Sequence, residues 1–232
     1  DHIPMEYCKK KGIEVIYLDD EWKKNEGKEV RATAEHTFAL MLALTRKIPY
    51  AFNDVLKGKW RREKFQGSEL YGKTLGIIGY GRVGQQVAEY AEAFGMNVIW
   101  HDRMPRYGFD KTGHINRITI PLEDVLTTSD IISVHVHLEG NEKLISFKEF
   151  SLMKPTAFFI NTSRGKVIDQ PALMDALMGD LIAGAALDVK DGEPKIKPYL
   201  INYAREFDNL IITPHIGGNT AESRLATQIY IA

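Results

Sequence analysis

Short apolar runs alternate with helical patterns along most of the 232-residue chain. The runs are nearly continuous and often end in polar or small residues. Strands of a parallel sheet that is covered on both faces have this pattern. The sequence therefore predicts six buried strands, at residues 74–79, 96–102, 130–136, 156–162, 183–189 and 209–213.

Helical patterns lie between the predicted strands. Gly95 and Gly179 are suited to end two of these helices, and Asp169 is suited to cap one ahead of Pro171. Strand–helix alternation of this kind predicts an α/β fold with a doubly wound parallel sheet. The predicted helices cover residues 82–95, 121–129, 148–154 and 169–180.

The first part of the chain has a looser pattern. Residues 12–18 predict a further strand, and a charged, turn-rich stretch follows it at 19–28. Residues 31–48 predict one long helix. We expect this helix to end before Pro49, because a proline disfavours helical backbone in the residue that precedes it.

Composition and charge narrow the class of protein. Hydrophobic residues make up 44% of the chain, charged residues make up 26%, and the net charge is −1, as in an ordinary soluble globular protein. No nucleic-acid or membrane partner is indicated, and the basic stretch at 57–64 is predicted to be a solvated loop or helix face. The single cysteine, Cys8, lies in a helix-like stretch and excludes an internal disulfide. This cysteine usage predicts a cytoplasmic location.

The strongest motif connects a predicted strand to a predicted helix. Gly79, Gly81 and Gly84 have the G-x-G-x-x-G spacing. Such glycines permit a tight turn, the close approach of a pyrophosphate and close helix packing, with the helix N-terminus facing the phosphates. Asp102 ends the next predicted strand, where a carboxylate accepts hydrogen bonds from ribose hydroxyls. The motif therefore predicts a nicotinamide dinucleotide.

The same carboxylate bears on which dinucleotide is bound. Asp102 would repel a 2′-phosphate, so the sequence favours NAD over NADP. Arg103 and Arg106 follow it closely, and an arginine there could pair with that phosphate. Both cofactors therefore stay open, with NAD preferred.

Three side chains suited to ketone reduction follow three successive strands. Reduction of a ketone needs a cation that holds the substrate and a proton donor that works near neutral pH. Arg164 could bind a carboxylate through two hydrogen bonds, and a glutamate, Glu193, beside the histidine, His215, would keep that imidazole protonated. Each residue alone is also consistent with an ordinary loop residue. Their combination behind a dinucleotide motif favours a catalytic site.

Several segments together resemble the D-isomer-specific 2-hydroxyacid dehydrogenase family. The resemblance runs from about Gly12 to Ser223, and one segment is most similar to the phosphoglycerate-dehydrogenase-type branch. That segment is GKWRREKFQGSELYGKTLGIIG (58–79). The others are AEHTFALMLALTR (34–46), GYGRVG (79–84), INTSRGKVID (160–169), AALDVKDGEP (185–194) and NLIITPHIGG (209–218).

The resemblance implies a function and a role for particular residues. It implies hydride transfer between NAD and a small D-2-hydroxy acid or 2-keto acid, with 3-phosphoglycerate among the candidates. Arg164 would bind the substrate carboxylate and carbonyl, Glu193 would pair with His215, and His215 would be the acid/base. The implied cofactor site consists of Gly79, Gly81, Arg82, Val83, Gly84, Asp102, Thr162, Ser163, Arg164, Asp188, His215, Gly217 and Gly218.

The chain departs from the family in one region. His137 stands where the family usually has a proline, two residues after the histidine that matches His135. The loop that follows, at 138–146, is one residue short and lacks the usual threonine. Cofactor contacts from His137 and this loop are therefore not expected to follow the family. The two histidines also have the spacing of metal ligands, but no third ligand suggests itself, and no metal is predicted.

The resemblance also implies a division into domains. Residues 1–30 would be a remnant of a flavodoxin-like substrate domain, 31–218 the dinucleotide-binding domain, and 219–232 the start of a helix that returns to the substrate domain. We expect a fragment of a longer protein that binds NAD with weak or no turnover by itself. The helix at 31–48 resembles the family's dimer-forming element, so a homodimer is expected.

Two other readings stay open. The same fold also occurs in NAD-responsive corepressor scaffolds, which retain the arginine, glutamate and histidine of the candidate catalytic site. Adenosylhomocysteine hydrolase has a similar GYG-x-VG cofactor loop, but the combination of Arg164, Glu193 and His215 argues against that enzyme.

Overall fold

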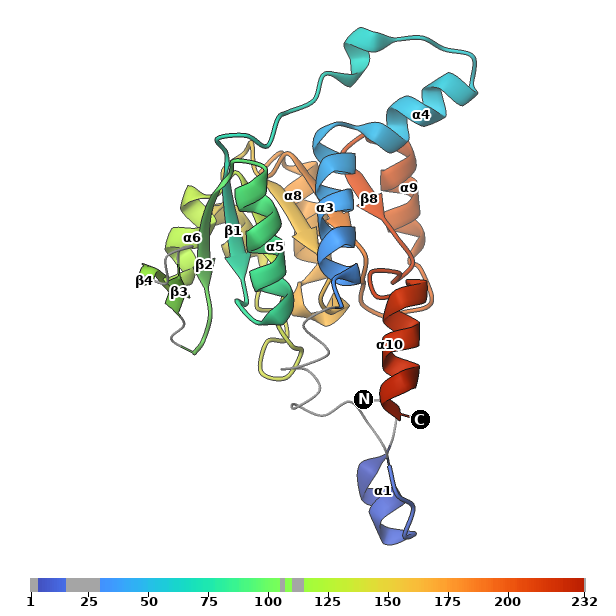
Figure 1. Ribbon diagram of the computed structural model, residues 1–232. Helices are drawn as coiled ribbons and strands as arrows, with labels where there is room; N and C mark the ends of the chain where they lie inside the picture. Colours follow the sequence, from blue (N-terminus) through green and yellow to red (C-terminus); the bar gives the residue numbers. More distant parts are fainter. Residues whose placement is uncertain (1–3, 16–29, 105–106, 110–114, 232) are drawn as a thin grey trace.

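A six-stranded parallel sheet forms the centre of the molecule (Figure 1). The computed structural model describes residues 4–15, 30–104, 107–109 and 115–231. The strand order is β2-β1-β5-β6-β7-β8, and every neighbouring pair is parallel. The strands are β1 Thr74–Ile78, β2 Asn97–His101, β5 Ile131–Val134, β6 Phe158–Asn161, β7 Gly184–Leu187 and β8 Leu210–Ile212. All six predicted strands and the doubly wound parallel sheet are confirmed.

Helices cover both faces of this sheet (Figure 1). The helices α3 (Ala32–Thr45) and α5 (Arg82–Ala93) pack on one face, where Phe38 and Val87 join a core with Ile77. On the other face Ile78 contributes to a second core. Because the side chains of adjacent strand residues point to opposite faces of the sheet, each short strand contributes side chains to both cores. The second face is covered by α6 (Leu122–Thr128), α7 (Phe147–Leu152), α8 (Gln170–Met178) and α9 (Pro198–Glu206).

The predicted long helix at 31–48 is two helices. The helix α3 ends at Thr45, Lys47 adopts a left-handed backbone with φ 52°, and α4 (Ile48–Leu56) follows. The first helix thus ends before Pro49, as predicted, but a second helix follows at once, and Pro49 lies in its first turn. A proline is tolerated there, since the first helical N–H groups have no intrahelical partner.

The structure of the first residues agrees with the sequence-based prediction only in part. The stretch around Cys8 forms the short helix α1 (Met5–Lys10), as its pattern indicated. The predicted strand at 12–18 is not present in its described part, because residues 12–15 have no regular secondary structure. Its remaining residues, and the turn-rich stretch at 19–28, lie outside the described residues.

Besides α4, five described elements were not predicted. They are the 3-10 helices η2 (Arg62–Phe65) and η3 (Gly165–Val167), the antiparallel strands β3 (Tyr107–Phe109) and β4 (Ile115–Ile118), and α9. The 3-10 helices and the two strands are short, and α9 buries only Leu200 and Tyr203, so it contributes few residues to the core. The basic stretch at 57–64 is exposed throughout, as predicted.

The chain reverses its direction across the sheet between β1 and β5. The strand β2 lies on one side of β1, while β5 and all later strands lie on the other. Open α/β sheets hold their ligands at such a switch point, beyond the carboxyl ends of the strands.

The last helix, α10 (Ala221–Ile231), leads away from the sheet (Figure 1). Among the described residues, no helix is both long and apolar enough to span a bilayer.

Candidate active site

The glycine-rich turn lies at the switch point, and each of its three glycines has a different environment. Gly79 has φ +95°, and a Cβ there would lie 2.7 Å from the carbonyl oxygen of His135. A Cβ at Gly84 would lie 2.2 Å from the Gly79 oxygen, so helix α5 packs closely on β1. A Cβ at Gly81 would meet no atom within 4 Å. Gly81 therefore leaves open space where the motif predicts a phosphate.

The N-terminus of α5 fits a dinucleotide pyrophosphate. Its first intrahelical hydrogen bond runs from the Gln85 N–H to the Gly81 carbonyl at 2.9 Å. The N–H groups of Arg82, Val83 and Gly84 precede that bond, and in the part of the chain that the structure describes no side chain caps this helix. Helix N-termini of this kind bind phosphate groups.

The side chain of Arg82 lies elsewhere. Its Nη1 donates a hydrogen bond to the Val30 carbonyl at 2.7 Å, in the segment that leads into α3. Burial lowers the pKa of this guanidinium below its usual range. The structure thus brings the Arg82 backbone to the predicted pyrophosphate position, but its guanidinium contacts the protein.

Asp102 follows β2 directly and connects to the glycine-rich turn. Its Oδ2 accepts a hydrogen bond from the Tyr80 N–H at 2.9 Å, and its Oδ1 accepts one from the Met104 N–H at 3.0 Å. Its own N–H donates to Thr119 Oγ1 at 2.9 Å. An ionised carboxylate accepts several hydrogen bonds at once, which suits this group to a ribose hydroxyl.

Arg164 lies on a turn that is ordered by a residue which the sequence analysis missed. Asn161, fully buried at the end of β6, accepts hydrogen bonds from the Ser163 N–H at 3.0 Å and the Ser163 hydroxyl at 2.8 Å. Its amide also donates to the Arg164 carbonyl at 3.1 Å. The exposed Arg164 guanidinium donates to the Ser163 carbonyl at 2.7 Å. Asn161 therefore shapes the backbone that presents Arg164.

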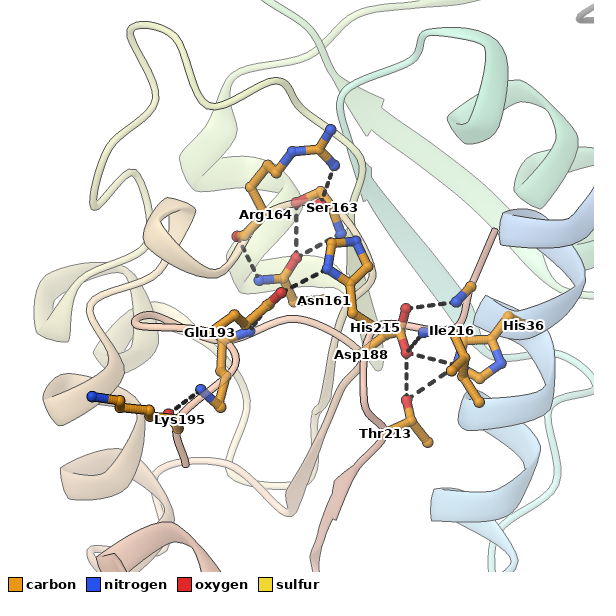
Figure 2. Close-up of polar contacts among 12 residues, drawn as sticks. His36, Asn161, Ser163, Arg164, Asp188, Glu193, Lys195, Thr213, His215 and Ile216 are labelled. Atoms are coloured by element: carbon orange, nitrogen blue, oxygen red, sulfur yellow. Dashed lines mark hydrogen bonds and ion pairs between the residues drawn. The ribbon is translucent and has the colours of Figure 1, made fainter. Parts of the chain in front are cut away.

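Glu193 and His215 come together although 22 residues separate them (Figure 2). Nδ1 of His215 lies 2.7 Å from Oε2 of Glu193. The other glutamate oxygen accepts a hydrogen bond from the Lys190 N–H at 2.8 Å. The histidine side chain is 51% exposed, so the imidazole is accessible to a small molecule.

Asp188 is buried at the end of β7 and holds the turn that carries His215. Its Oδ1 accepts hydrogen bonds from the Thr213 hydroxyl at 2.6 Å and the Ile216 N–H at 2.9 Å, and its Oδ2 accepts one from the Gly217 N–H at 2.8 Å. Burial by itself would raise the pKa of Asp188, but the hydrogen bonds from His36, Thr213 and these backbone groups hold it below the usual range.

The other predicted cofactor residues fall into two groups. Thr162 and Ser163 are buried, and their hydroxyls bond to Thr37 at 2.9 Å and to Asn161 at 2.8 Å. These hydroxyls point into the protein. Gly217 packs against Asp188, whereas a Cβ at Gly218 would meet nothing within 4 Å. Gly218 therefore borders open space beside His215.

The turns that carry the candidate side chains are in direct contact. A Cβ at Gly165, next to Arg164, would lie 2.0 Å from the Lys190 carbonyl carbon and 2.5 Å from the Asp191 nitrogen. A cavity of about 520 Å³ adjoins the Glu193–His215 pair, and Lys190 and Arg205 are among its lining residues. Figure 2 shows Arg164, Glu193 and His215 extending from three neighbouring loops.

The histidine pair near β5 does not form a metal centre with other described residues. Within those residues, no group of three or more His, Cys, Asp or Glu side chains is placed to hold a metal ion. His135 instead contacts the Ser133 hydroxyl, with Nε2 and Oγ 2.8 Å apart. Burial lowers the pKa of His135 to about 3, so its imidazole is neutral at ordinary pH.

Chemically, the arrangement offers an exposed cation, Arg164, and an imidazole held by a carboxylate, at the same edge of the sheet as a turn suited to a dinucleotide. Sequence reasoning missed two supporting residues, Asn161 and His36. Asn161 lies in the segment INTSRGKVID, at the end of a predicted buried strand. A polar amide in that position needs hydrogen-bond partners, and this requirement could have indicated its role. His36 carried no local signal, because its partners lie far away in the sequence.

Comparison with known proteins places these features in a family context. The model of the D-isomer specific 2-hydroxyacid dehydrogenase NAD binding domain matches residues 38–217. A D-3-phosphoglycerate dehydrogenase from Archaeoglobus fulgidus is 38% identical over the whole chain, which spans 42% of that relative. A glyoxylate reductase from Pyrococcus furiosus is also 38% identical over the whole chain, which spans 68% of that relative.

Solved structures agree with this fold. A D-lactate dehydrogenase from Aquifex aeolicus, complexed with NAD and lactic acid, superimposes with a TM-score of 0.80 at 33% identity. The match covers 99% of this chain and 70% of that one. Other matched structures include a complex with NADPH. Proteins with both cofactors and with several substrates are thus similar to this chain.

Proposed function

The chain belongs to the D-isomer specific 2-hydroxyacid dehydrogenase family, and we propose that it carries the NAD site and the acid/base of an oxidoreductase acting on a small D-2-hydroxy acid or 2-keto acid. The observation that carries the proposal is the 2.7 Å contact between Glu193 Oε2 and His215 Nδ1, at the same carboxyl edge of the sheet as Arg164 and the glycine-rich turn. A histidine held by a carboxylate and an exposed cation are what ketone reduction requires of a protein.

Each candidate side chain has one role in this proposal. Arg164 binds the substrate carboxylate and polarises its carbonyl, because a planar guanidinium matches two oxygens at once. His215 gives a proton from its second ring nitrogen to the carbonyl oxygen during reduction, and takes it back during oxidation. Glu193 holds the imidazole in the required orientation. NAD, when bound, would supply the hydride for reduction or accept it for oxidation.

The proposed cofactor site uses backbone more than side chains. The N–H groups at the start of α5 take the pyrophosphate, Gly81 leaves room for it, and Asp102 accepts the adenosine ribose hydroxyls. The Asp102 carboxylate disfavours a 2′-phosphate, which is why we propose NAD rather than NADP. Thr162, Ser163 and Asp188 would lie near the nicotinamide, with Gly217 and Gly218 close behind His215.

The domain division and the dimer are also proposals. Residues 31–218 would form the dinucleotide-binding domain, while 1–30 and 219–232 would belong to a substrate domain. The helix α4 and the segment after it extend away from the sheet and carry exposed apolar side chains, which supports a homodimer formed by α3 and α4 (Figure 1). Those side chains include Ile48, Phe52, Leu56 and Trp60. A monomeric mass by light scattering would contradict the homodimer.

NADH oxidation by the complete protein tests the proposed reaction. The assay compares glyoxylate, hydroxypyruvate, pyruvate and phosphohydroxypyruvate, with NADPH as the alternative cofactor and His215→Asn as the control variant. We expect turnover of at least one acid, preference for NADH, and loss of activity in the variant. Tight NADH binding without turnover of any acid would contradict the enzyme and favour an NAD-responsive scaffold.

A further inference from the structure

We propose that His36 on α3 is a positioning residue for His215 and acts through the Asp188 carboxylate (Figure 2). The inference rests on the proposed function, in which His215 is the acid/base. His36 Nε2 lies 3.2 Å from Asp188 Oδ1 and 3.1 Å from Thr213 Oγ1. These two partners stand at the carboxyl ends of the neighbouring strands β7 and β8.

The hydrogen-bond pattern makes His36 the donor. Thr213 Oγ1 lies 2.6 Å from Asp188 Oδ1, so the single hydroxyl proton is already used on the carboxylate. An ionised carboxylate has no proton to give. The proton shared among these atoms therefore sits on His36 Nε2, which donates to Asp188 and Thr213 together. His36 thus anchors the carboxylate from the side of α3.

The anchored carboxylate in turn fixes the backbone of His215. This residue has φ +57°, a left-handed backbone conformation that residues other than glycine rarely adopt. Its own N–H donates to the Asp188 carbonyl at 2.9 Å, and the next two N–H groups donate to the Asp188 carboxylate. Such a conformation persists only where the surrounding contacts impose it.

Packing connects the same three residues. A Cβ at Gly217 would lie 2.9 Å from Asp188 Oδ2 and 3.5 Å from His36 Cδ2. A side chain at Gly217 would therefore meet both the carboxylate and the imidazole of His36, so the turn after His215 passes close to both groups. Removing the imidazole would take away both the donor to Asp188 and the surface beneath the turn.

Three variants of the complete protein separate positioning from general stability. His36→Leu removes the donor and keeps an apolar side chain, whereas His36→Gln keeps an amide donor of similar reach. The matched control is Thr45→Val on the same helix, which removes a buried hydrogen bond to the Met41 carbonyl at 2.9 Å, at the other end of α3. The measurements are amide hydrogen exchange at residues 216 and 217, NADH affinity, kcat and KM for a 2-keto acid, and thermal unfolding.

We expect His36→Leu to speed exchange at both amides by about tenfold or more, because the clamp opens locally. We expect kcat to fall by roughly tenfold to hundredfold, with KM for NADH almost unchanged. His36→Gln should recover most of both properties, and Thr45→Val should resemble the wild type at these amides.

Unchanged exchange and kcat in His36→Leu would overturn the inference. Equal defects in His36→Gln and His36→Leu would also overturn it, because the donated hydrogen bond would then be irrelevant. If the wild-type protein turns over no 2-keto acid, the proposed function fails. The exchange rates at residues 216 and 217 still decide whether His36 holds this turn.

Discussion

Glu193 Oε2 lies 2.7 Å from His215 Nδ1, and a backbone N–H of Lys190 holds the other glutamate oxygen. A carboxylate at Nδ1 fixes which nitrogen bears the shared proton and directs the opposite nitrogen outward. The pair therefore has a defined direction: Nδ1 bonds to the protein, and in the proposed function the other ring nitrogen would face a substrate oxygen.

This direction predicts unequal effects of substitution in the pair. His215→Asn removes the proton donor, so kcat/KM for a 2-keto acid should fall by about 100-fold to 10,000-fold. Glu193→Gln keeps a side chain that still orients the ring, so its loss should be smaller. NADH titrations should give similar affinities for both variants and the wild type. A larger loss in Glu193→Gln than in His215→Asn would contradict the assigned roles.

Substitution of Arg164 should affect substrate binding, whereas substitution of Asn161 should affect stability. Arg164→Lys keeps the charge but loses two-point binding, so KM for the keto acid should rise by about tenfold or more while stability stays unchanged. Asn161→Ala leaves Ser163 and the Arg164 turn without buried partners, which should cost about 1–3 kcal/mol of unfolding free energy. Denaturant titration combined with steady-state kinetics separates the two effects. Equal stability in Asn161→Ala and the wild type would be evidence against Asn161 as the organiser of this turn.

Two glycines of the same turn make a matched pair. An added Cβ at Gly84 would meet the Gly79 oxygen at 2.2 Å, so Gly84→Ala should lower the free energy of unfolding by about 1–3 kcal/mol. Gly81 has open space around it, so Gly81→Ala should fold normally. NADH binding by Gly81→Ala should weaken by about tenfold, because the methyl group occupies the proposed phosphate space. Thermal unfolding and NADH titration of both variants test this contrast, and normal NADH binding in Gly81→Ala would exclude the phosphate from that space.

His135 predicts how stability depends on pH. Burial lowers the pKa of His135 from 6.5 to about 3, so between these values the unfolded chain binds a proton that the folded chain does not. Stability should therefore fall as the pH drops from 7 to 5. Because the residue keeps some contact with solvent, we expect a loss of roughly 1–2 kcal/mol at pH 5. Denaturant unfolding of His135→Gln should show a smaller decrease, and an identical decrease would assign the effect to other groups.

The sheet was predictable because each strand carries its own local signal. A run such as TLGII is apolar enough to be predicted as a buried strand, and the glycine spacing after it predicts a dinucleotide-binding turn. The break at Lys47 was not predictable in the same way, because Pro49 is compatible with either the end or the start of a helix.

The candidate site residues were predictable mainly where they follow strands closely or belong to a segment that resembles the family. Arg164, Asp188 and His215 follow β6, β7 and β8, so the order of the sheet brings them to one edge. The contact between His36 and Asp188 joins residues 152 positions apart, and nothing near either residue announces it. The inward turn of Thr162 and the Arg82 bond to Val30 likewise depend on packing partners that no local pattern encodes.

Gly165 has a consequence for engineering this fold. Its backbone touches Lys190 and Asp191 so closely that no side chain fits between the two turns. A redesigned loop at Arg164 would therefore displace the Glu193 loop unless both were replaced together. Attempts to transplant substrate preference from a relative should exchange the two loops as one unit, with the glycine kept at their junction.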